Sequence, residues 1–222
     1  MTIKIDTILF DMDGTIIQSL SIWDELIERF VGSENVMRFW DLRKTMPDKG
    51  SGMDYTCLIL QNEFNIQKTR EEILHDLKRT AQIIFEEQDI PFIEGFEDFH
   101  NNLIQNSIKT GLATNAPDYA LNVVKRKLNL HKFFGQHIYN SCIVKKFKPD
   151  PAVFLHSLEK LNSKAENCVI FEDSSEGIEA ARAAGILCVG IKNSTNEDEL
   201  GDAHSIISDY KNLTLSSLIT LL

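Results

Sequence analysis

The sequence contains few cysteines, and they lack the spacing that would indicate a metal or redox motif. The four are Cys57, Cys142, Cys168 and Cys188. No pair is separated by two residues, as in common zinc and dithiol motifs. Cys168 and Cys188 stand in apolar runs, which is typical of buried thiols. We therefore expect neither a zinc cluster nor a disulfide framework.

Acidic residues outnumber basic ones, and long apolar runs are lacking. The chain has 23 Lys and Arg against 33 Asp and Glu, a net charge of −10. This argues against non-specific nucleic-acid binding, although a local lysine or metal could still bind a small anion. No apolar run reaches membrane-spanning length, and the N-terminus lacks a basic region followed by an apolar stretch. We expect a cytoplasmic protein with neither nucleic acid nor membrane as a partner.

The sequence is organised around residues 8–15, which read Ile-Leu-Phe-Asp-Met-Asp-Gly-Thr. The apolar run Thr7–Phe10 predicts a short buried strand. Alternation points Asp11 and Asp13 the same way if the strand continues, and Gly14 permits a tight turn after them. Converging carboxylates repel each other unless a cation, a shared proton or strong donors compensate. We interpret the stretch as functional rather than as an ordinary polar turn.

Helical periodicity fills the region between residues 18 and 88. Apolar residues recur at helical spacing in four segments, which are Leu20–Phe30, Val36–Leu42, Tyr55–Phe64 and Arg70–Glu86. No strand pattern lies among them, and residues 46–53 have the glycine and proline content of a loop. We therefore predict an all-helical insertion after the first strand.

Strands and helices alternate after Pro91. Five further strands are predicted, at Lys109–Ala113, Ile138–Tyr139, Cys168–Phe171, Leu187–Ile191 and Ser205–Ile207. Helices are expected at Phe96–Gln105, after Thr114 with Pro117 in the first turn, and from Asp150 as N-cap and Pro151 as first residue to about Leu161. Two more are expected, one that is capped by Ser174 or Ser175 and runs through Ala184, and one at Thr214–Leu222. Such alternation predicts an α/β fold with a doubly wound, mostly parallel sheet. We assign residues 1–17 and 89–222 to this core and residues 18–88 to a helical cap domain.

Three of the predicted strands end in polar clusters, which is where active sites lie in such sheets. The acidic residues are Asp11, Asp13, Glu172 and Asp173, without a neighbouring His or Cys. Oxygen ligands of this kind suit Mg²⁺, which prefers few carboxylates, several waters and a phosphate. Taken alone, Glu172-Asp173 could equally be an acidic pair favoured by a helix N-terminus.

Two further positions predict an anion site. Thr114 and the backbone N–H groups of Asn115 and Ala116 would bind phosphate oxygens at the start of a helix, and Lys148 would add a positive charge. Each has a simpler interpretation, since Thr114 alone could be a turn residue and Lys148 alone a solvated lysine. Together, at neighbouring strand ends, they predict neutralisation of a phosphoryl group during transfer.

With these motifs in this order, the sequence resembles the haloacid dehalogenase superfamily of phosphohydrolases, in the branch with a helical cap after the first strand. Residues 11–15 resemble the first motif of that family, and Thr114 fits the second. Residues 148–151 fit the third motif and residues 172–177 the fourth. The resemblance spans essentially the whole chain and implies a Rossmann-like core.

The resemblance also implies roles for these residues. Asp11 would attack phosphorus and form an aspartyl-phosphate, while Asp13 would protonate the leaving oxygen and then activate water. Mg²⁺ would be held by Asp11, the backbone carbonyl of Asp13 and Asp173, with Glu172 binding it directly or supporting the other ligands. Thr114 and Lys148 would bind the phosphoryl oxygens, and the cap would close over the substrate.

Departures from the family pattern leave alternatives open. Residues 16–19 read Ile-Ile-Gln-Ser where many relatives carry an acidic residue. Related sugar-phosphate mutases use an arginine of the cap loop, whereas residues 46–53 offer only Lys49, with Arg43 just before them. We expect Lys49 to contact the leaving group of the substrate.

We therefore expect a Mg²⁺-dependent phosphatase that acts on a small phosphorylated metabolite, as a monomer or weak homodimer. A β-phosphoglucomutase-like sugar-phosphate mutase is the alternative. A binding protein with a degenerate site is a third hypothesis, and the intact acidic set argues against it.

Overall fold

A computed structural model of the chain describes residues 4–45, 52–194, 196 and 199–222. It contains one six-stranded parallel sheet in the order β3-β2-β1-β4-β5-β6. The strands are β1 (Thr7–Phe10), β2 (Lys109–Thr114), β3 (Ile138–Asn140), β4 (Cys168–Glu172), β5 (Leu187–Ile191) and β6 (Ser205–Ile207). In this order the chain builds outward from β1 in both directions, so the sheet is doubly wound. The expected α/β fold is confirmed.

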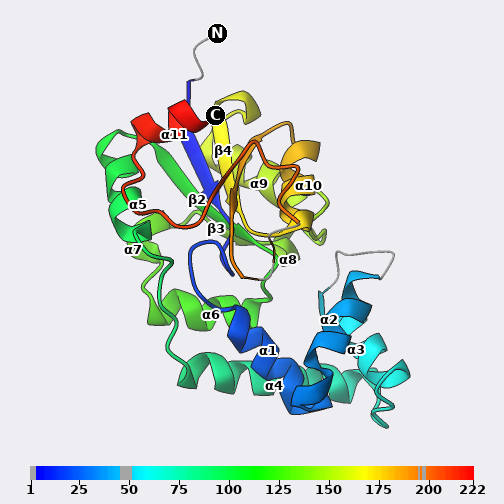
Figure 1. Cartoon of the computed structure of the whole chain (residues 1–222). Helices are drawn as coiled ribbons and strands as arrows, with labels where there is room; N and C mark the ends of the chain where they lie inside the picture. The colour runs from blue at the N-terminus through cyan, green and yellow to red at the C-terminus, as the bar shows by residue number, and fades with distance from the viewer. Residues whose placement is uncertain (1–3, 46–51, 195, 197–198) are drawn as a thin grey trace.

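Helices cover both faces of the sheet (Figure 1). On one side lie α5 (Phe96–Gln105), α7 (His131–Phe134) and α11 (Leu215–Leu221), and on the other α9 (Ala152–Leu161) and α10 (Ser175–Ala183). Helix α6 (Asp118–Lys127) follows β2, and the one-turn α8 (Ser141–Val144) follows β3. None of the helices in the described ranges has the length and apolar character needed to cross a bilayer.

Strand alternation explains why the sheet needs helices on both faces. In β1, Phe10 packs in an aromatic cluster with Phe96 of α5 and Phe171 of β4, with ring centroids 5.5 and 5.2 Å away. Its neighbour Leu9 belongs to a separate core with Phe154 of α9. All four residues of β1 are buried. Such continuous apolar runs are expected of a parallel sheet that is covered on both sides.

Of the described α-helices between β1 and β2, all but α5 form a separate layer beyond the end of the sheet (Figure 1). They are α1 (Leu20–Val31), α2 (Val36–Lys44), α3 (Gly52–Asn62) and α4 (Arg70–Glu87), with a short 3₁₀ turn, η1 (Ser33–Asn35), before α2. Helix α4 begins with a full capping box, in which Thr69 and Glu72 satisfy each other's backbone N–H groups. The predicted helical insertion after the first strand is therefore confirmed, and residues 18–88 remain its predicted limits.

The chain enters and leaves this helical layer through two segments that lie side by side. Gln18 N–H donates to Pro91 O at 2.9 Å, and Ile93 N–H donates to Ile16 O at 2.8 Å. Ile17 and Phe92 form an antiparallel bridge between the same segments. We call residues 16–18 and 91–93 the neck.

Most predicted elements match the structure, and the differences have local causes. Pro117 precedes α6 in an extended conformation (ψ 157°) rather than occupying its first turn. Helix α9 begins at Ala152, one residue later than predicted, because Pro151 still lies in the preceding turn and the Asp150 carboxylate accepts from Ala152 N–H at 2.9 Å. Sequence periodicity did not indicate α7 and α8, since four residues are too few to show it.

Candidate active site

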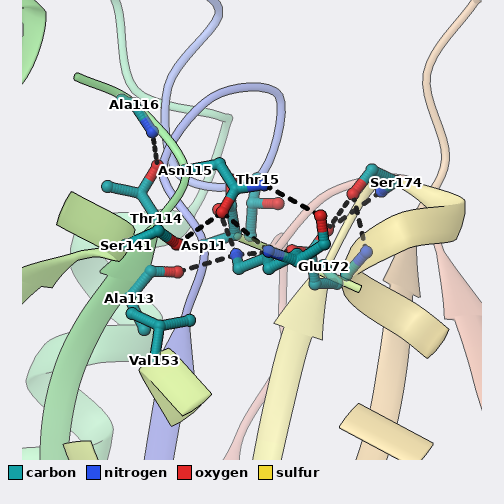
Figure 2. Close-up of polar contacts among 12 residues, drawn as sticks. Asp11, Thr15, Ala113, Thr114, Asn115, Ala116, Ser141, Val153, Glu172 and Ser174 are labelled. Carbon is teal, nitrogen blue, oxygen red and sulfur yellow. Dashed lines mark hydrogen bonds and ion pairs between the residues drawn. The ribbon is translucent and has the colours of Figure 1, made fainter. Parts of the chain in front are cut away.

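The candidate site lies at the switch point of the parallel sheet, between β1 and β4, where the order in which the chain adds strands reverses. Asp11 follows β1 directly, and its N–H extends the ladder by donating to Phe171 O of β4 at 3.0 Å. The end of β2 brings Thr114 to the same edge, because β2 is the other neighbour of β1. In open parallel sheets this crevice is the usual position of a ligand site. Figure 2 shows Asp11 between Thr114 and Glu172.

Lys148 is the centre of the polar network. Its Nζ donates to Asp11 Oδ1 at 2.5 Å, to Glu172 Oε1 at 2.7 Å and to Ala113 O at 2.8 Å. It also lies 4.7 Å from the centroid of the Phe154 ring. The side chain is 2% exposed, so it is a buried cation rather than a solvated lysine. Burial alone would lower the pKa of Lys148, but the two carboxylates raise it above its ordinary value.

Asn115 fixes the segment that carries Lys148. Its Oδ1 accepts from Lys148 N–H at 3.0 Å and from Ser141 Oγ at 2.5 Å, and its Nδ2 donates to Lys148 O at 3.3 Å. The side chain of Asn115 thus joins the end of β2 to the start of α8 and to the Lys148 backbone. Substrate binding by its backbone N–H stays a prediction.

Glu172 is held by the two residues that lead into α10. Its Oε2 accepts from the N–H groups of Asp173 and Ser174, at 2.9 and 3.0 Å, and from Ser174 Oγ at 2.9 Å. Ser174, one of the two predicted caps, is the N-cap of this helix, and its Oγ also accepts from Gly177 N–H at 3.1 Å. A Cβ at Gly177 would come 1.8 Å from Glu172 Oε1, so glycine is required for this carboxylate to fit.

Asp173 is oriented by three neighbours. Its Oδ1 accepts from Thr15 Oγ1 at 3.3 Å, and its Oδ2 accepts from Asn193 Nδ2 at 3.1 Å. Asn196 Nδ2 donates to the Asp173 backbone carbonyl at 2.7 Å. Gly14 packs directly on this carboxylate with φ +73°, and a Cβ there would come 2.1 Å from Asp173 Oδ2.

The carboxylates form a site whose chemistry fits a hard cation. Oxygen atoms of Asp11, Glu172 and Asp173 all lie within 4.8 Å of one another, and all three residues are buried. Burial, together with the charge of Glu172, raises the pKa of Asp11 to about 7 against the effect of Lys148. Burial and the neighbouring carboxylates also raise the pKa of Asp173 well above its ordinary value. One lysine thus leaves negative charge uncompensated, and oxygen ligands of this kind fit Mg²⁺.

Asp13 belongs to a different network. Its Oδ1 accepts from Ser19 Oγ at 2.5 Å and from Trp23 Nε1 at 3.0 Å, and the side chain is half-buried. Burial raises the pKa of Asp13, while these two donors act to lower it. The carboxylate of Asp13 is therefore held from the helical layer, whereas that of Asp11 is held from the core.

Two further residues were predicted to contact the substrate, Thr114 and Lys49. Thr114 is buried, and its Oγ1 accepts from Ala116 N–H at 3.0 Å, so this N–H is already paired. The predicted substrate contact Lys49 lies outside the described residues.

Sequence patterns did not indicate Ser19, Trp23 or Asn193 as parts of the site. From the sequence, Trp23 is interpreted as part of an amphipathic helix and Ser19 as part of a departure from the family pattern, while Asn193 follows a strand end as many polar residues do. The signals that could have found them are the proximity of residue 19 to Asp13 in sequence and the position of Asn193 after a fourth strand end of the same sheet.

A doubly wound parallel sheet, a helical insertion after β1 and carboxylates facing a buried lysine at the switch point define a class of hydrolases. The family model for haloacid dehalogenase-like hydrolases matches residues 5–185. The chain belongs to this family. The expectation of a haloacid dehalogenase-like phosphatase is confirmed by the named relatives described next.

A phosphorylated carbohydrates phosphatase of Thermotoga maritima is 28% identical to this chain over 196 residues, which cover 86% of this chain and 88% of that protein. A crystal structure of a hydrolase of this superfamily from Entamoeba histolytica aligns with a TM-score of 0.80 at 22% identity and covers 98% of this chain and 99% of that one. The structure of a putative β-phosphoglucomutase from Thermotoga maritima aligns with a TM-score of 0.75 at 28% identity and covers 98% of this chain and 100% of that one.

Proposed function

We propose that this protein is a Mg²⁺-dependent phosphatase that hydrolyses a small phosphorylated sugar or a similar metabolite through an aspartyl-phosphate. The observation that carries the proposal is the pairing of Asp11 with Lys148 Nζ at 2.5 Å inside the Asp11, Glu172 and Asp173 cluster. A phosphorylated carbohydrates phosphatase among the relatives supports the substrate class.

In the proposed reaction, a carboxylate oxygen of Asp11 attacks phosphorus, and the bond between phosphorus and the leaving oxygen breaks. Asp13 donates its proton to that oxygen. Water then attacks the phosphorus of the aspartyl-phosphate while Asp13 takes up a proton, which releases inorganic phosphate and restores Asp11. Lys148 and Thr114 stabilise the charge on the phosphoryl oxygens.

Asp11, Asp173 and the backbone carbonyl of Asp13 would hold the metal, and Glu172 would bind it directly or through water. A bound Mg²⁺ would supply positive charge that offsets the carboxylates and the phosphate. Glu172 already makes four hydrogen bonds in this structure, to Lys148 and to the start of α10. The bond to Lys148 gives Glu172 a second role, which is to hold the ammonium group beside Asp11.

The test is a phosphate-release screen over phosphorylated metabolites with Mg²⁺, run beside an assay for phosphosugar isomerisation. We expect phosphate release without a bisphosphate primer, loss of activity in EDTA and recovery when Mg²⁺ is restored. The comparison with a putative β-phosphoglucomutase makes mutase activity the specific alternative. Conversion of β-glucose 1-phosphate to glucose 6-phosphate at ten times the rate of phosphate loss, a preference of about 1.4 kcal/mol, would establish the mutase instead.

A further inference from the structure

The two carboxylate oxygens of Asp13 have different surroundings. Ser19 Oγ and Trp23 Nε1 both donate to Oδ1, at 2.5 and 3.0 Å. Among the residues that the structure describes, every side-chain hydrogen bond to Asp13 goes to Oδ1. Since Asp13 is only half-buried, Oδ2 is the oxygen left to meet another molecule.

Both donors come from the start of the helical layer. Trp23 lies in the first turn of α1, and its ring packs edge-on against Phe85 of α4, with centroids 5.2 Å apart. Ser19 occupies the N-cap position of α1, where a serine hydroxyl usually accepts a backbone hydrogen bond, yet it makes no such cap. Its hydroxyl is directed to Asp13 instead.

The chemistry of the donors determines where a proton can sit. An indole N–H donates but cannot accept, so Trp23 can only present a hydrogen to Oδ1. A protonated carboxyl has one oxygen that carries hydrogen and one that accepts. With two donors already on Oδ1, the proton of the neutral acid is left to Oδ2.

We propose that Trp23 is a positioning residue that directs Oδ2 of Asp13 toward the leaving group of the substrate. The inference rests on the proposed phosphatase function, in which Asp13 is the acid. The proton on Oδ2 passes to the leaving oxygen as the bond between phosphorus and that oxygen breaks, and Asp13 becomes a carboxylate with Oδ1 still held by Ser19 and Trp23. Because Trp23 belongs to α1, the orientation of the acid follows the position of the helical layer.

The chain offers a matched control for this residue. Trp40 of α2 is the second tryptophan, and its Nε1 donates to Asp24 Oδ1 at 2.7 Å. It also packs edge-on against a phenylalanine, Phe39, with centroids 5.2 Å apart. Trp23→Phe and Trp40→Phe therefore remove the same group from similar surroundings, and only the first loses a contact with Asp13.

The measurement is kcat/KM for two phosphomonoesters. This constant covers the steps from substrate binding to departure of the leaving group, and these include the proton transfer from Asp13. An alkyl phosphate needs a proton from the acid, whereas p-nitrophenol leaves readily as an anion. For Trp23→Phe we expect a fall of about 10- to 100-fold with the alkyl phosphate and less than about two-fold with p-nitrophenyl phosphate, since a general acid typically contributes 10²–10⁴-fold. Trp40→Phe should change neither value.

The outcomes separate this inference from the function on which it rests. Equal losses on both esters, or no loss on either, would overturn the role of Trp23 while phosphatase activity stands. Absence of metal-dependent phosphate release by the unmodified enzyme would overturn the proposed function itself.

Circular dichroism and melting curves of both variants show whether the fold is retained. If Trp23→Phe unfolds, Ser19→Ala, which removes the other donor to Oδ1, must show the same dependence on the leaving group, and equal losses there would overturn the proposal.

Discussion

At the scale of single residues, the side chains of Asp11 and Asp13 are held by different parts of the molecule. Asp11 pairs with Lys148 in the core, and Asp13 is held by Ser19 and Trp23 from the helical layer. A nucleophile benefits from a fixed position beside a positive charge that favours its ionised form, and an acid benefits from a free oxygen. Separate supports allow the two carboxylates to have different protonation states at one pH.

Asp11→Asn is the sharpest test of the nucleophile. The amide keeps the shape of the side chain but lacks the anionic oxygen, so turnover should fall by at least about 10³-fold, as for other nucleophile losses. The measurement is phosphate release at saturating substrate, together with acid-stable labelling of the protein by substrate phosphate. Asp98→Asn, at an exposed position of α5, is the control and should be normal. Near-normal turnover of pure, folded Asp11→Asn would remove this residue from its role.

At the scale of elements, the turn after β1 depends on one glycine. Gly14 has φ +73° and faces the Asp173 carboxylate, whereas Gly185 after α10 has φ +69° with nothing within 4 Å of a Cβ. The two positions share the left-handed backbone and differ in the space that the site leaves.

We expect Gly14→Ala to weaken Mg²⁺ binding by at least about ten-fold, because Asp173 must move, and each ten-fold corresponds to about 1.4 kcal/mol. Gly185→Ala should lower stability by about 1–2 kcal/mol through backbone strain alone and leave Mg²⁺ affinity unchanged. Titration calorimetry with Mg²⁺ and thermal melts check both variants. Equal Mg²⁺ affinities would show that Gly14 serves the turn and not the site.

The same elements show which features of the fold and the site could be predicted from the sequence. Helix α5 has the predicted bounds, Phe96–Gln105, because its apolar spacing and flanking glycine are local signals. The ends of β1, β2 and β4 could be predicted to meet because parallel strands place their carboxyl ends on one edge. The roles of Ser19 and Trp23 could not, since they depend on how α1 packs beside Asp13. That Asn115 holds Lys148 also arises only from tertiary contacts.

At the scale of the whole molecule, the acidic site should make stability depend on pH. The pKa of Asp11 is raised to about 7 and that of Asp173 well above its ordinary value, chiefly by burial. Carboxyls with raised folded-state pKa values bind more protons in the folded than in the unfolded chain. The free energy of unfolding therefore falls as pH rises from about 4, the unfolded value, through 7.

We expect the melting temperature in EDTA to fall between about pH 5.5 and 7.5, and saturating Mg²⁺ to reduce this fall by stabilising the ionised form. Asp11→Asn should show a smaller fall in EDTA, because it cannot ionise. His100, whose pKa burial lowers to about 4, acts in the opposite direction but is present in both proteins. Identical pH dependence of the two proteins in EDTA would contradict this prediction. Scanning calorimetry at several pH values gives the comparison.

The neck gives the molecule a modular construction. Because Gln18 and Pro91 are hydrogen-bonded at 2.9 Å, the two ends of the helical insertion lie next to each other. A short turn could join them without moving β1 or β2, and a foreign insertion with closely spaced ends could be grafted there. The helical insertion could then change in evolution independently of the residues on the sheet, subject to one constraint. Any replacement must again supply a hydrogen-bond donor for Asp13, the role that Ser19 and Trp23 fill in this chain.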